Sequence, residues 1–392
     1  MNHKSFLEGR VMNHLSSSIR AFARGHAGLA IGLLFSLLSL RIQADLPIFL
    51  TPLPLEYRAT YHYPLSYYND LECSDFNFDF WAAGYHRELN NAFLNNCGCL
   101  QDVTTHTQGV LEILYSGIDF NEFQTSILID KGLFVGFELD KAVGNCNLWH
   151  VGYRAILPIK AVQASGVSFG FFQQRIFGLG NLAMETYVGY HTDRWFLDLD
   201  LGGKLPTDKI VHNINVTTGN YNHFEFRVGP DFGWRPIEWF ALTLDATYNH
   251  VFKAKERRQI TAVGSAGRLI GTPFTDATNH WGYFWGHVGL NFFHPDCCDL
   301  GIMLQYELYA RTKDHVRFCT STFTSVGENG PVTVELDDSL INANTNTLAH
   351  KVRGEVFYRI CGAELFAAAS YVIAGRFAYQ ETEWHLGFKM YF

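Results

Sequence analysis

The chain of 392 residues holds 30 Lys and Arg against 38 Asp and Glu, which gives a formal net charge of −8 at pH 7. Phosphate binding needs a basic surface, so this balance excludes nucleic acid as an expected partner. Aromatic residues make up 15% of the chain, with 33 Phe and 19 Tyr, and 35 Gly stand against only 11 Pro. This composition, with a mean hydropathy near zero, favours an all-β protein whose strands have one apolar and one polar face.

The first 44 residues have the layout of a secretory signal peptide. Basic residues precede an apolar run, 27–40, and Arg41-Ile42-Gln43-Ala44 follows it. The run of about 14 residues is shorter than the roughly 20 that a membrane-spanning helix needs. We therefore expect residues 1–44 to direct export and to be cleaved after Ala44, which leaves 25 basic and 37 acidic residues. Met12 is an alternative start, and a buried N-terminal helix is the alternative structure.

Two stretches near the start of the exported chain are hard to interpret. Residues 45–75, rich in Pro and Tyr, are expected to form an N-terminal periplasmic segment or an unassigned strand, ahead of a single domain at 76–392. Residues 89–128 contain the Cys97-Gly98-Cys99 turn and show no regular period, so they could hold further strands or a loop folded inward.

Segments with alternating apolar and polar residues predict amphipathic β-strands. Trp195, Leu197 and Leu199 share one face of such a segment, whereas Asp198 and Asp200 share the other. The same period of two returns several times downstream. Twelve strands are expected, near residues 76–88, 130–140, 148–160, 181–191, 195–206, 221–234, 238–253, 280–294, 299–313, 349–361, 363–377 and 382–392.

The connections between these segments alternate between tight and long. Tight ones are expected at 192–194, 235–238, 295–299 and 361–363, and long polar ones at 207–221, 254–279 and 313–349. Outer-membrane barrels place short turns in the periplasm and long loops outside. The pattern predicts an all-β fold, a transmembrane antiparallel up-and-down β-barrel of about 12 strands, within a range of 10–16.

The last strand carries a resemblance to a known class of protein. Trp384, Leu386, Phe388 and Met390 lie on one face of it, and the chain ends at Phe392. This resembles the closing strand of bacterial outer-membrane β-barrels, which typically ends in an aromatic residue read by the assembly machinery. The resemblance implies a location in the bacterial outer membrane, with its lipid and the barrel assembly machinery as partners.

The chain has eight cysteines, and an even number in an exported chain predicts disulfides. The candidates are Cys73, Cys97, Cys99, Cys146, Cys297, Cys298, Cys319 and Cys361. Four of them, Cys146, Cys297, Cys298 and Cys361, fall at expected periplasmic turns. Because Cys297 and Cys298 are adjacent, disulfide links to other envelope proteins or to a second copy are also considered.

In this placement of cysteines the chain resembles the cysteine-containing major outer membrane proteins of chlamydia-like intracellular bacteria, whose disulfide networks stiffen the envelope. The resemblance covers architecture and cysteine placement, so it assigns no functional residue. A metal site is the rival interpretation of the cysteines. However, Cys97-x-Cys99 lacks a second CxxC or a spaced His pair, and no metal is expected.

Motifs of catalysis are not found in the sequence. It contains no G-x-S-x-G, no H-E-x-x-H and no Walker-type loop, and its 17 His are scattered. His150, His223, His287 and His385 are expected to be solvated groups of a pore rather than bases. We therefore expect no enzyme and no cofactor. An enzyme built on the barrel wall is the third interpretation.

Charged residues on the polar face of the strands would be costly against lipid, so they are expected to line the interior. The pore-lining candidates are Arg154, Asp198, Asp200, Glu225, Arg227, Asp245, Glu307, Arg311, Arg353, Glu355, Arg359 and Lys389. In a barrel of about eight strands such groups can pair and plug the interior. Twelve strands favour a water-filled passage, in which the near balance of charge predicts weak ion selectivity.

The expected function is that of an outer-membrane porin, a passive diffusion channel for small hydrophilic solutes. The alternative is a structural or adhesive surface protein that meets its partners through the long loops at 254–279 and 313–349 and uses the barrel as an anchor.

Overall fold

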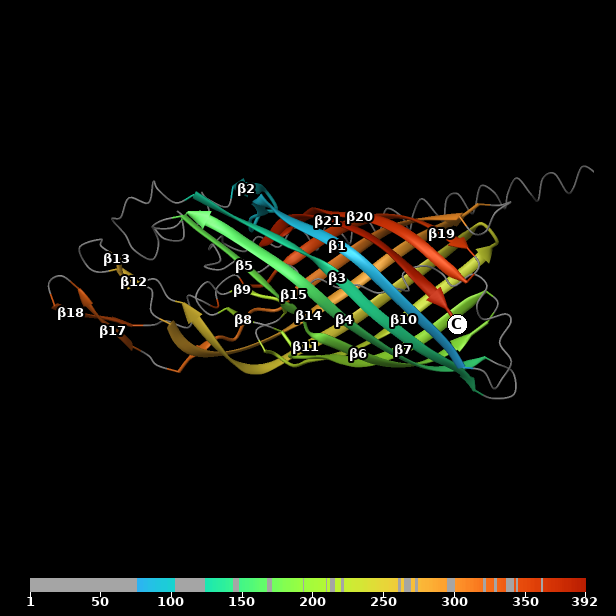
Figure 1. Ribbon diagram of the computed structural model, residues 1–392, viewed down its shortest axis with the longest axis horizontal. Helices are drawn as coiled ribbons and strands as arrows, with labels where there is room; N and C mark the ends of the chain where they lie inside the picture. The colour runs from blue at the N-terminus through green and yellow to red at the C-terminus, as the bar shows by residue number, and fades with distance from the viewer. Residues whose placement is uncertain are drawn as a thin grey trace, which may run out of the picture. The chain divides into compact units, whose positions relative to one another are not determined.

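Twelve long strands make up most of the described part of the chain (Figure 1). The computed structural model describes residues 76–102, 124–143, 148–167, 171–192, 194–208, 210–211, 216–219, 222–259, 262–263, 269–271, 274–294, 300–319, 322–327, 330–335, 342, 345–360 and 362–392. The expected signal peptide and the segment 45–75 lie outside these residues. The long strands are β1 (Phe76–Leu94), β3 (Gln124–Val143), β4 (Trp149–Val167), β6 (Leu182–His191), β7 (Trp195–Leu205), β10 (Glu225–Ile237), β11 (Phe240–Gln259), β14 (Phe274–Phe293), β15 (Leu300–Arg311), β19 (Leu348–Ile360), β20 (Ala363–Arg376) and β21 (Ala378–Tyr391).

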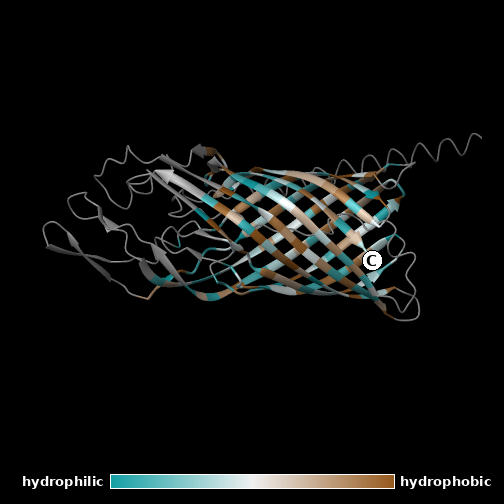
Figure 2. Ribbon diagram, in the orientation of Figure 1, coloured by the Kyte–Doolittle hydropathy of each residue, from teal (hydrophilic) through white to brown (hydrophobic). Residues whose placement is uncertain are grey.

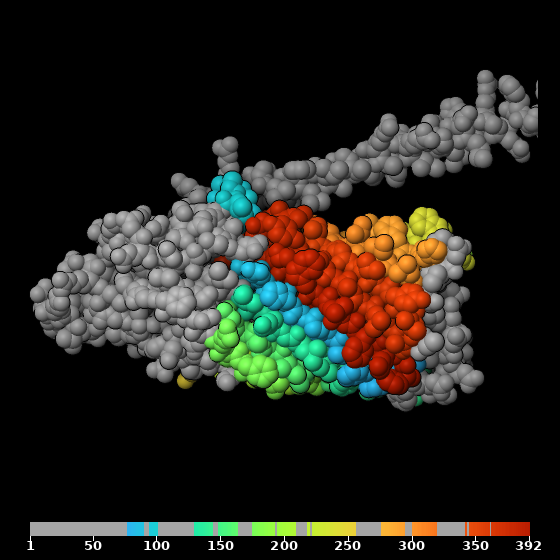
Figure 3. Space-filling model, turned by 45° about the horizontal axis from the view of Figure 1, so that its top comes forward, coloured from blue at the N-terminus to red at the C-terminus, as the bar shows by residue number. Residues whose placement is uncertain are grey.

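The twelve strands close into one antiparallel barrel. Each pairs with the preceding and the following long strand, and β21 returns to pair with β1. At this seam the amide of Phe392 donates to the carbonyl of Phe78 at 2.9 Å, and Figure 3 shows the C-terminal strands directly beside β1. The predicted up-and-down barrel of about 12 strands is confirmed. No helix in the described residues is long and apolar enough to cross a membrane.

Shorter strands gather at the barrel end opposite the C-terminus (Figure 1). Three of them extend the barrel wall: β2 (Leu100–Asp102) pairs with β1, β5 (Phe171–Leu179) with β4, and β16 (Arg317–Phe318) with β14. The others form two-stranded sheets of their own. These are β8 (Ile210–Val211) with β9 (Val216–Thr217), β12 (Ala262–Val263) with β13 (Leu269–Gly271), and β17 (Thr322–Gly327) with β18 (Gly330–Glu335).

The period of two separates an apolar outer face from a polar inner face. Along β7, Leu197, Leu199 and Leu201 are exposed, whereas Asp198 and Asp200 are buried. Figure 2 shows this alternation of apolar and hydrophilic residues repeated over the barrel strands. A closed barrel leaves no unpaired strand edge, and its apolar exterior suits the hydrocarbon core of a bilayer. The barrel is therefore a transmembrane one, in the bacterial outer membrane.

Aromatic side chains form a belt at the barrel end with the short turns. Trp149, Tyr190 and Trp195 are neighbours on β4, β6 and β7, with ring centroids 5.2 and 5.4 Å apart. Phe240 and Phe292 continue the belt on β11 and β14 at 5.5 Å. Such amphipathic or apolar rings at one level mark a membrane interface.

The connections differ from the sequence expectation in two places. The loop expected at 254–279 is partly strand, because β11 runs on to Gln259 and β14 begins at Phe274. From Glu256 to Gln259 every residue of β11 is polar, so this part of the strand has no apolar face and the period that identifies strands is lost. The connection of β20 to β21, expected at 378–381 between the strands 363–377 and 382–392, is the single residue Phe377, whose φ is 52°.

Candidate functional site

The barrel interior collects most of the charged side chains of the strands. Fifteen buried carboxylates belong to the twelve long strands: Asp79, Asp130, Glu138, Asp140, Glu185, Asp198, Asp200, Glu225, Asp231, Asp245, Glu307, Glu355, Glu364, Glu381 and Glu383. The buried basic residues of these strands are Arg87, Arg154, Arg311, Lys351, Arg353 and Lys389. Four more basic residues, Lys160, Lys204, Arg227 and Arg359, are half-buried and face inner carboxylates.

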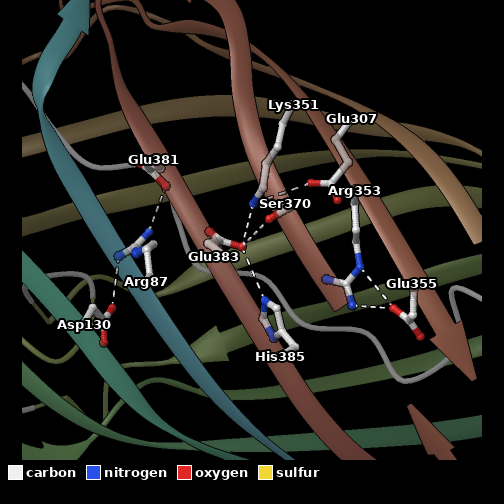
Figure 4. A network of polar contacts seen from close by, with 10 residues as sticks. All are labelled: Arg87, Asp130, Glu307, Lys351, Arg353, Glu355, Ser370, Glu381, Glu383 and His385. Atoms are coloured by element: carbon white, nitrogen blue, oxygen red, sulfur yellow. Dashed lines mark hydrogen bonds and ion pairs between the residues drawn. The ribbon is translucent and has the colours of Figure 1, made fainter. Parts of the chain in front are cut away.

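One wall of the interior, formed by β15, β19, β20 and β21, is a network of paired charges (Figure 4). Lys351 Nζ lies 2.7 Å from Glu383 Oε2 and 3.9 Å from Glu307 Oε2. Arg353 donates from Nε and Nη2 to Glu355 Oε2, at 3.1 and 2.6 Å. These contacts offset part of the cost of burying each charge. Because the acids are paired with bases, the net charge of this wall is close to zero.

The network continues across the seam onto β1 and β3. Arg87 Nη2 donates to Asp130 Oδ2 at 3.0 Å, and Arg87 Nη1 lies 3.6 Å from Glu381 Oε2 (Figure 4). The Tyr85 hydroxyl donates to the other oxygen of Asp130 at 2.7 Å. The seam of the barrel is thus held by side-chain contacts in addition to the backbone ladder.

A second group of paired charges centres on Arg154 of β4. Its Nε donates to Glu138 at 3.0 Å, its Nη1 lies 3.6 Å from Asp200, and its guanidinium lies 4.3 Å from the centre of the Tyr187 ring. The Tyr187 hydroxyl donates to the same oxygen of Glu138 at 2.9 Å. Lys389 bridges from β21, 3.8 Å from Glu138.

A cluster of carboxylates lies on β7, β10 and β11. Asp198, Asp231 and Asp245 are direct cross-strand neighbours on the inner face. Asp200 joins them, because carboxylate oxygens of Asp200, Asp231 and Asp245 all lie within 4.8 Å of one another. Oxygen ligands of this kind suit hard cations.

Two histidines occupy the inner face near the short-turn ends of β4 and β6. The rings of His150 and His191 stack with centroids 4.1 Å apart. His150 Nδ1 lies 3.0 Å from Asp140, and His191 Nε2 lies 2.5 Å from Asp198. The expectation that His150, His223, His287 and His385 are solvated was wrong: all four are buried, and the polar groups beside His150 explain how an imidazole is accommodated there.

Aromatic rings also occupy positions on the inner face. At five inner-face glycines an aromatic residue of the neighbouring strand lies directly opposite, where an added Cβ would meet its ring. The pairs are Trp81 with Gly136, Tyr187 with Gly152, Phe196 with Gly233, Phe357 with Gly301, and Phe366 with Gly387. A Cβ on any of these glycines would meet the ring at 2.0 to 2.4 Å, so each ring uses the space that the glycine leaves.

The twelve pore-lining candidates all lie on the inner face. Ten are buried, and Arg227 and Arg359 are half-buried. Their role in conduction stays a prediction. The expected near balance of charge does not hold for the described inner face, because the candidates omitted more acids than bases. Asp79, Asp140 and Asp231 were among those missed, although Asp231 has the same strand parity as the candidates Glu225 and Arg227 on β10.

The described cysteines are not paired. Cys97, Cys99 and Cys319 are free and exposed, so the expected disulfides are not formed at these three positions. Cys97 and Cys99 share one tight turn, in which both amides donate to Asn95 Oδ1 at 2.9 and 3.0 Å. This turn follows β1, at the barrel end away from the short turns where four other cysteines were expected. Cys73, Cys146, Cys297, Cys298 and Cys361 lie outside the described residues, and their pairing stays a prediction.

Comparison with solved structures places the fold among outer-membrane barrels. An outer membrane channel from Pseudomonas putida F1 matches with a TM-score of 0.54 and 10% identity, over 83% of this chain and 98% of that one. The Pseudomonas putida toluene transporter TodX matches with a TM-score of 0.40 and 7% identity, over 81% and 88%. The β-domain of the Bordetella autotransporter BrkA matches with a TM-score of 0.38 and 12% identity, over 81% and 99%.

No protein-family model and no curated protein matches the sequence. The first likeness supports the barrel fold, and the other two are too distant to add to it. The special resemblance to cysteine-containing chlamydia-like proteins gains no support from these comparisons. The chain has the fold of a bacterial outer-membrane channel.

Proposed function

We propose that the protein is an outer-membrane porin, a passive diffusion channel for small hydrophilic solutes. The observation that carries this proposal is the charged inner face, which extends from Asp79 and Asp140 near the short turns to Arg87 and Glu381 at the other end. Burying each ionised group costs several kcal/mol unless it is paired well. A barrel that served only to fill a membrane could hold apolar or small neutral residues at lower cost.

The side chains of the inner face are closely packed. Inner side chains such as Asp200, Thr247 and Glu381 are essentially inaccessible to solvent in the described state, and aromatic rings occupy positions between the charges. In the expected water-filled passage, solutes would pass close to protein charges. Small ions fit this description better than larger solutes.

Planar-bilayer recording of the purified, refolded protein tests the proposal. We expect discrete single-channel steps of low conductance in KCl. The control is the same preparation denatured by heat before addition. Folded protein, identified by its heat-modifiable migration on gels, that never conducts would reject the porin.

A surface protein anchored by the barrel is the second candidate, and the burial of the inner charges favours it. The sheets β12 with β13 and β17 with β18 lie at the end away from the C-terminus, where they are available to partners (Figure 1). Under this alternative, folded barrels are silent in bilayers, and deletion of 322–335 abolishes surface binding without loss of folding. Disulfide links to envelope proteins remain a proposal for the cysteines outside the described residues.

A further inference from the structure

We propose that the outside of the barrel binds a phosphate-bearing lipid of the outer leaflet, at a basic patch on β11, β14 and the segment 312–319. The patch is defined by four exposed bases and two histidines: Lys253, Lys255, His280, Lys313, His315 and Arg317. This binding goes beyond the proposed channel function and does not depend on it, because the patch lies on the side of the strands that faces away from the lumen.

Strand parity places the two histidines of the patch on the outside of β14. Asn279 and Trp281 are buried on the inner face, so His280 between them faces outward. The amide of His315 donates to the His280 carbonyl at 3.1 Å, and the two rings stack with centroids 4.6 Å apart. Each imidazole has at least one N–H donor whether or not it is protonated. The rings therefore offer hydrogen bonds to phosphate oxygens.

The register gathers the bases around these rings. Thr278 of β14 lies opposite Arg317 on one side and opposite Lys255 on the other. A bulge in β11 sets Lys253 opposite His280. Lys253 and Arg317 are both near enough to His280 for their charges to act on it. Bases from three separate segments of the chain thus meet on one outer surface.

The net charge of this surface is positive. Lys313 is exposed two residues before His315 and adds a fourth base. Of the described side chains on this surface, Asp276 is the acidic one. Within the described residues, none of the four bases forms an ion pair. An anionic partner would therefore relieve the repulsion among bases that the protein itself leaves uncompensated.

The patch lies at the level where lipid headgroups begin. From Phe292 in the aromatic belt, β14 runs 12 residues to His280. At about 3.4 Å per residue and a tilt of about 40°, this places His280 about 30 Å above the belt. The apolar band of an outer-membrane barrel is about 25 Å tall. Tyr248 and Phe284, paired and exposed four residues nearer the belt, mark its upper edge.

A lipid fits both the bases and the apolar surface beneath them. Outer-membrane barrels turn the end with long connections outside, so the headgroups at this level belong to the outer leaflet. Clusters of basic residues at a membrane surface bind anionic headgroups. A phosphate-bearing lipid would place its phosphate on the patch and its acyl chains against Tyr248 and Phe284. A soluble anion would use the bases alone.

The test titrates the refolded, lipid-free protein in micelles of a neutral detergent with fluorescently labelled lipopolysaccharide, and follows the anisotropy. We expect saturable binding, and much weaker binding of lipopolysaccharide whose phosphates have been removed. In the double variant Lys253→Gln, Arg317→Gln the dissociation constant should rise about fivefold for each removed base. The control is Lys131→Gln, Arg194→Gln, which also removes two exposed bases and should bind as the native protein does. Lys131 lies on β3, six places from β14 in the strand order and thus on the opposite side of the barrel.

The outcomes are read on protein whose folding is confirmed by heat-modifiable migration on gels. Equal dissociation constants for the native protein and the Lys253→Gln, Arg317→Gln variant overturn the patch as the site. Equal binding of the dephosphorylated lipid overturns the recognition of phosphate, and displacement by equimolar inorganic phosphate overturns the preference for a lipid. If the double variant does not fold, its two single variants are compared with Lys131→Gln, and equal constants in all three overturn the proposal. A barrel that never conducts rejects the channel and leaves these results unchanged.

Discussion

Lys351 shows how single side chains keep a charged interior stable. Its ammonium lies between Glu307 on the neighbouring strand β15 and Glu383 on β21, the second strand on the other side. Ser370 donates to the same oxygen of Glu383 at 3.2 Å. Removing one partner of such a buried group leaves an uncompensated charge. The free-energy cost of this charge exceeds the stabilisation that the ion pair provided. Inner charges are therefore held as a set, and few of them can change alone.

Inner-face glycines leave space for the aromatic rings opposite them, and Gly152 provides a direct test of this packing. A Cβ at Gly152 would meet the Tyr187 ring at 2.0 Å, so Gly152→Ala displaces a buried ring that also donates to Glu138. We expect a loss of about 1–3 kcal/mol in the free energy of unfolding. Urea titration of the protein refolded in lipid vesicles measures it.

The matched control for Gly152 is Gly354, a glycine on the lipid-facing side of β19. An added Cβ there meets no atom within 4 Å. Gly354→Ala should leave the free energy of unfolding unchanged or raise it by about 0.5 kcal/mol, because alanine restricts the unfolded chain. Equal midpoints for the two variants would show that the ring opposite Gly152 is free to move.

At the scale of elements, the period of two was enough to locate all twelve long strands, because each separates lipid from the interior. It could not show which residues meet across strands. The pairing of Gly136 with Trp81, or of Asp231 with Asp245, depends on register, and register is fixed by turns and bulges whose effects a single sequence does not display. The network of Figure 4 was unpredictable for the same reason.

The outer face of β7 offers the element-scale test. Leu199 lies midway along the strand and is 59% exposed, whereas Leu205 ends it. Leu199→Arg should destabilise the inserted barrel by about 2–4 kcal/mol, and Leu205→Arg by about 0–1 kcal/mol, because the cost of a charge falls from the midplane to the interface. The free energy of unfolding from vesicles measures both. A larger loss at Leu205 would mean that the membrane lies nearer the long connections than the apolar face indicates.

For the whole molecule, closure and strand number could be predicted because alternation and turn length repeat over more than three hundred residues. The filling of the lumen could not. Each inner charge looks the same in sequence whether it faces water or a partner, and Arg154 meets Glu138 and Asp200 from strands separated in sequence by up to about fifty positions. The excess of acids emerged only when Asp79, Asp130 and Asp231 joined the inner face.

The orientation of the barrel in the outer membrane can be tested with its exposed thiols. Long connections and the exposed thiols of Cys97, Cys99 and Cys319 lie at the barrel end away from the C-terminus. Outer-membrane barrels turn that end to the outside. A membrane-impermeant maleimide should therefore label intact cells, and replacement of all three cysteines by Ser should remove this labelling.

The control for orientation puts a thiol at the opposite end. Arg194 is exposed in the short connection between β6 and β7. In the triple-Ser background, Arg194→Cys should react only after the outer membrane is permeabilised, because a periplasmic turn is shielded from the reagent. The added signal is read against the triple-Ser protein, which accounts for the remaining native cysteines. Labelling of Arg194→Cys on intact cells, with no labelling of Cys97 in the native protein, would mean that the barrel is inserted with its short turns outside. The sheets β12 with β13 and β17 with β18 would then face the periplasm.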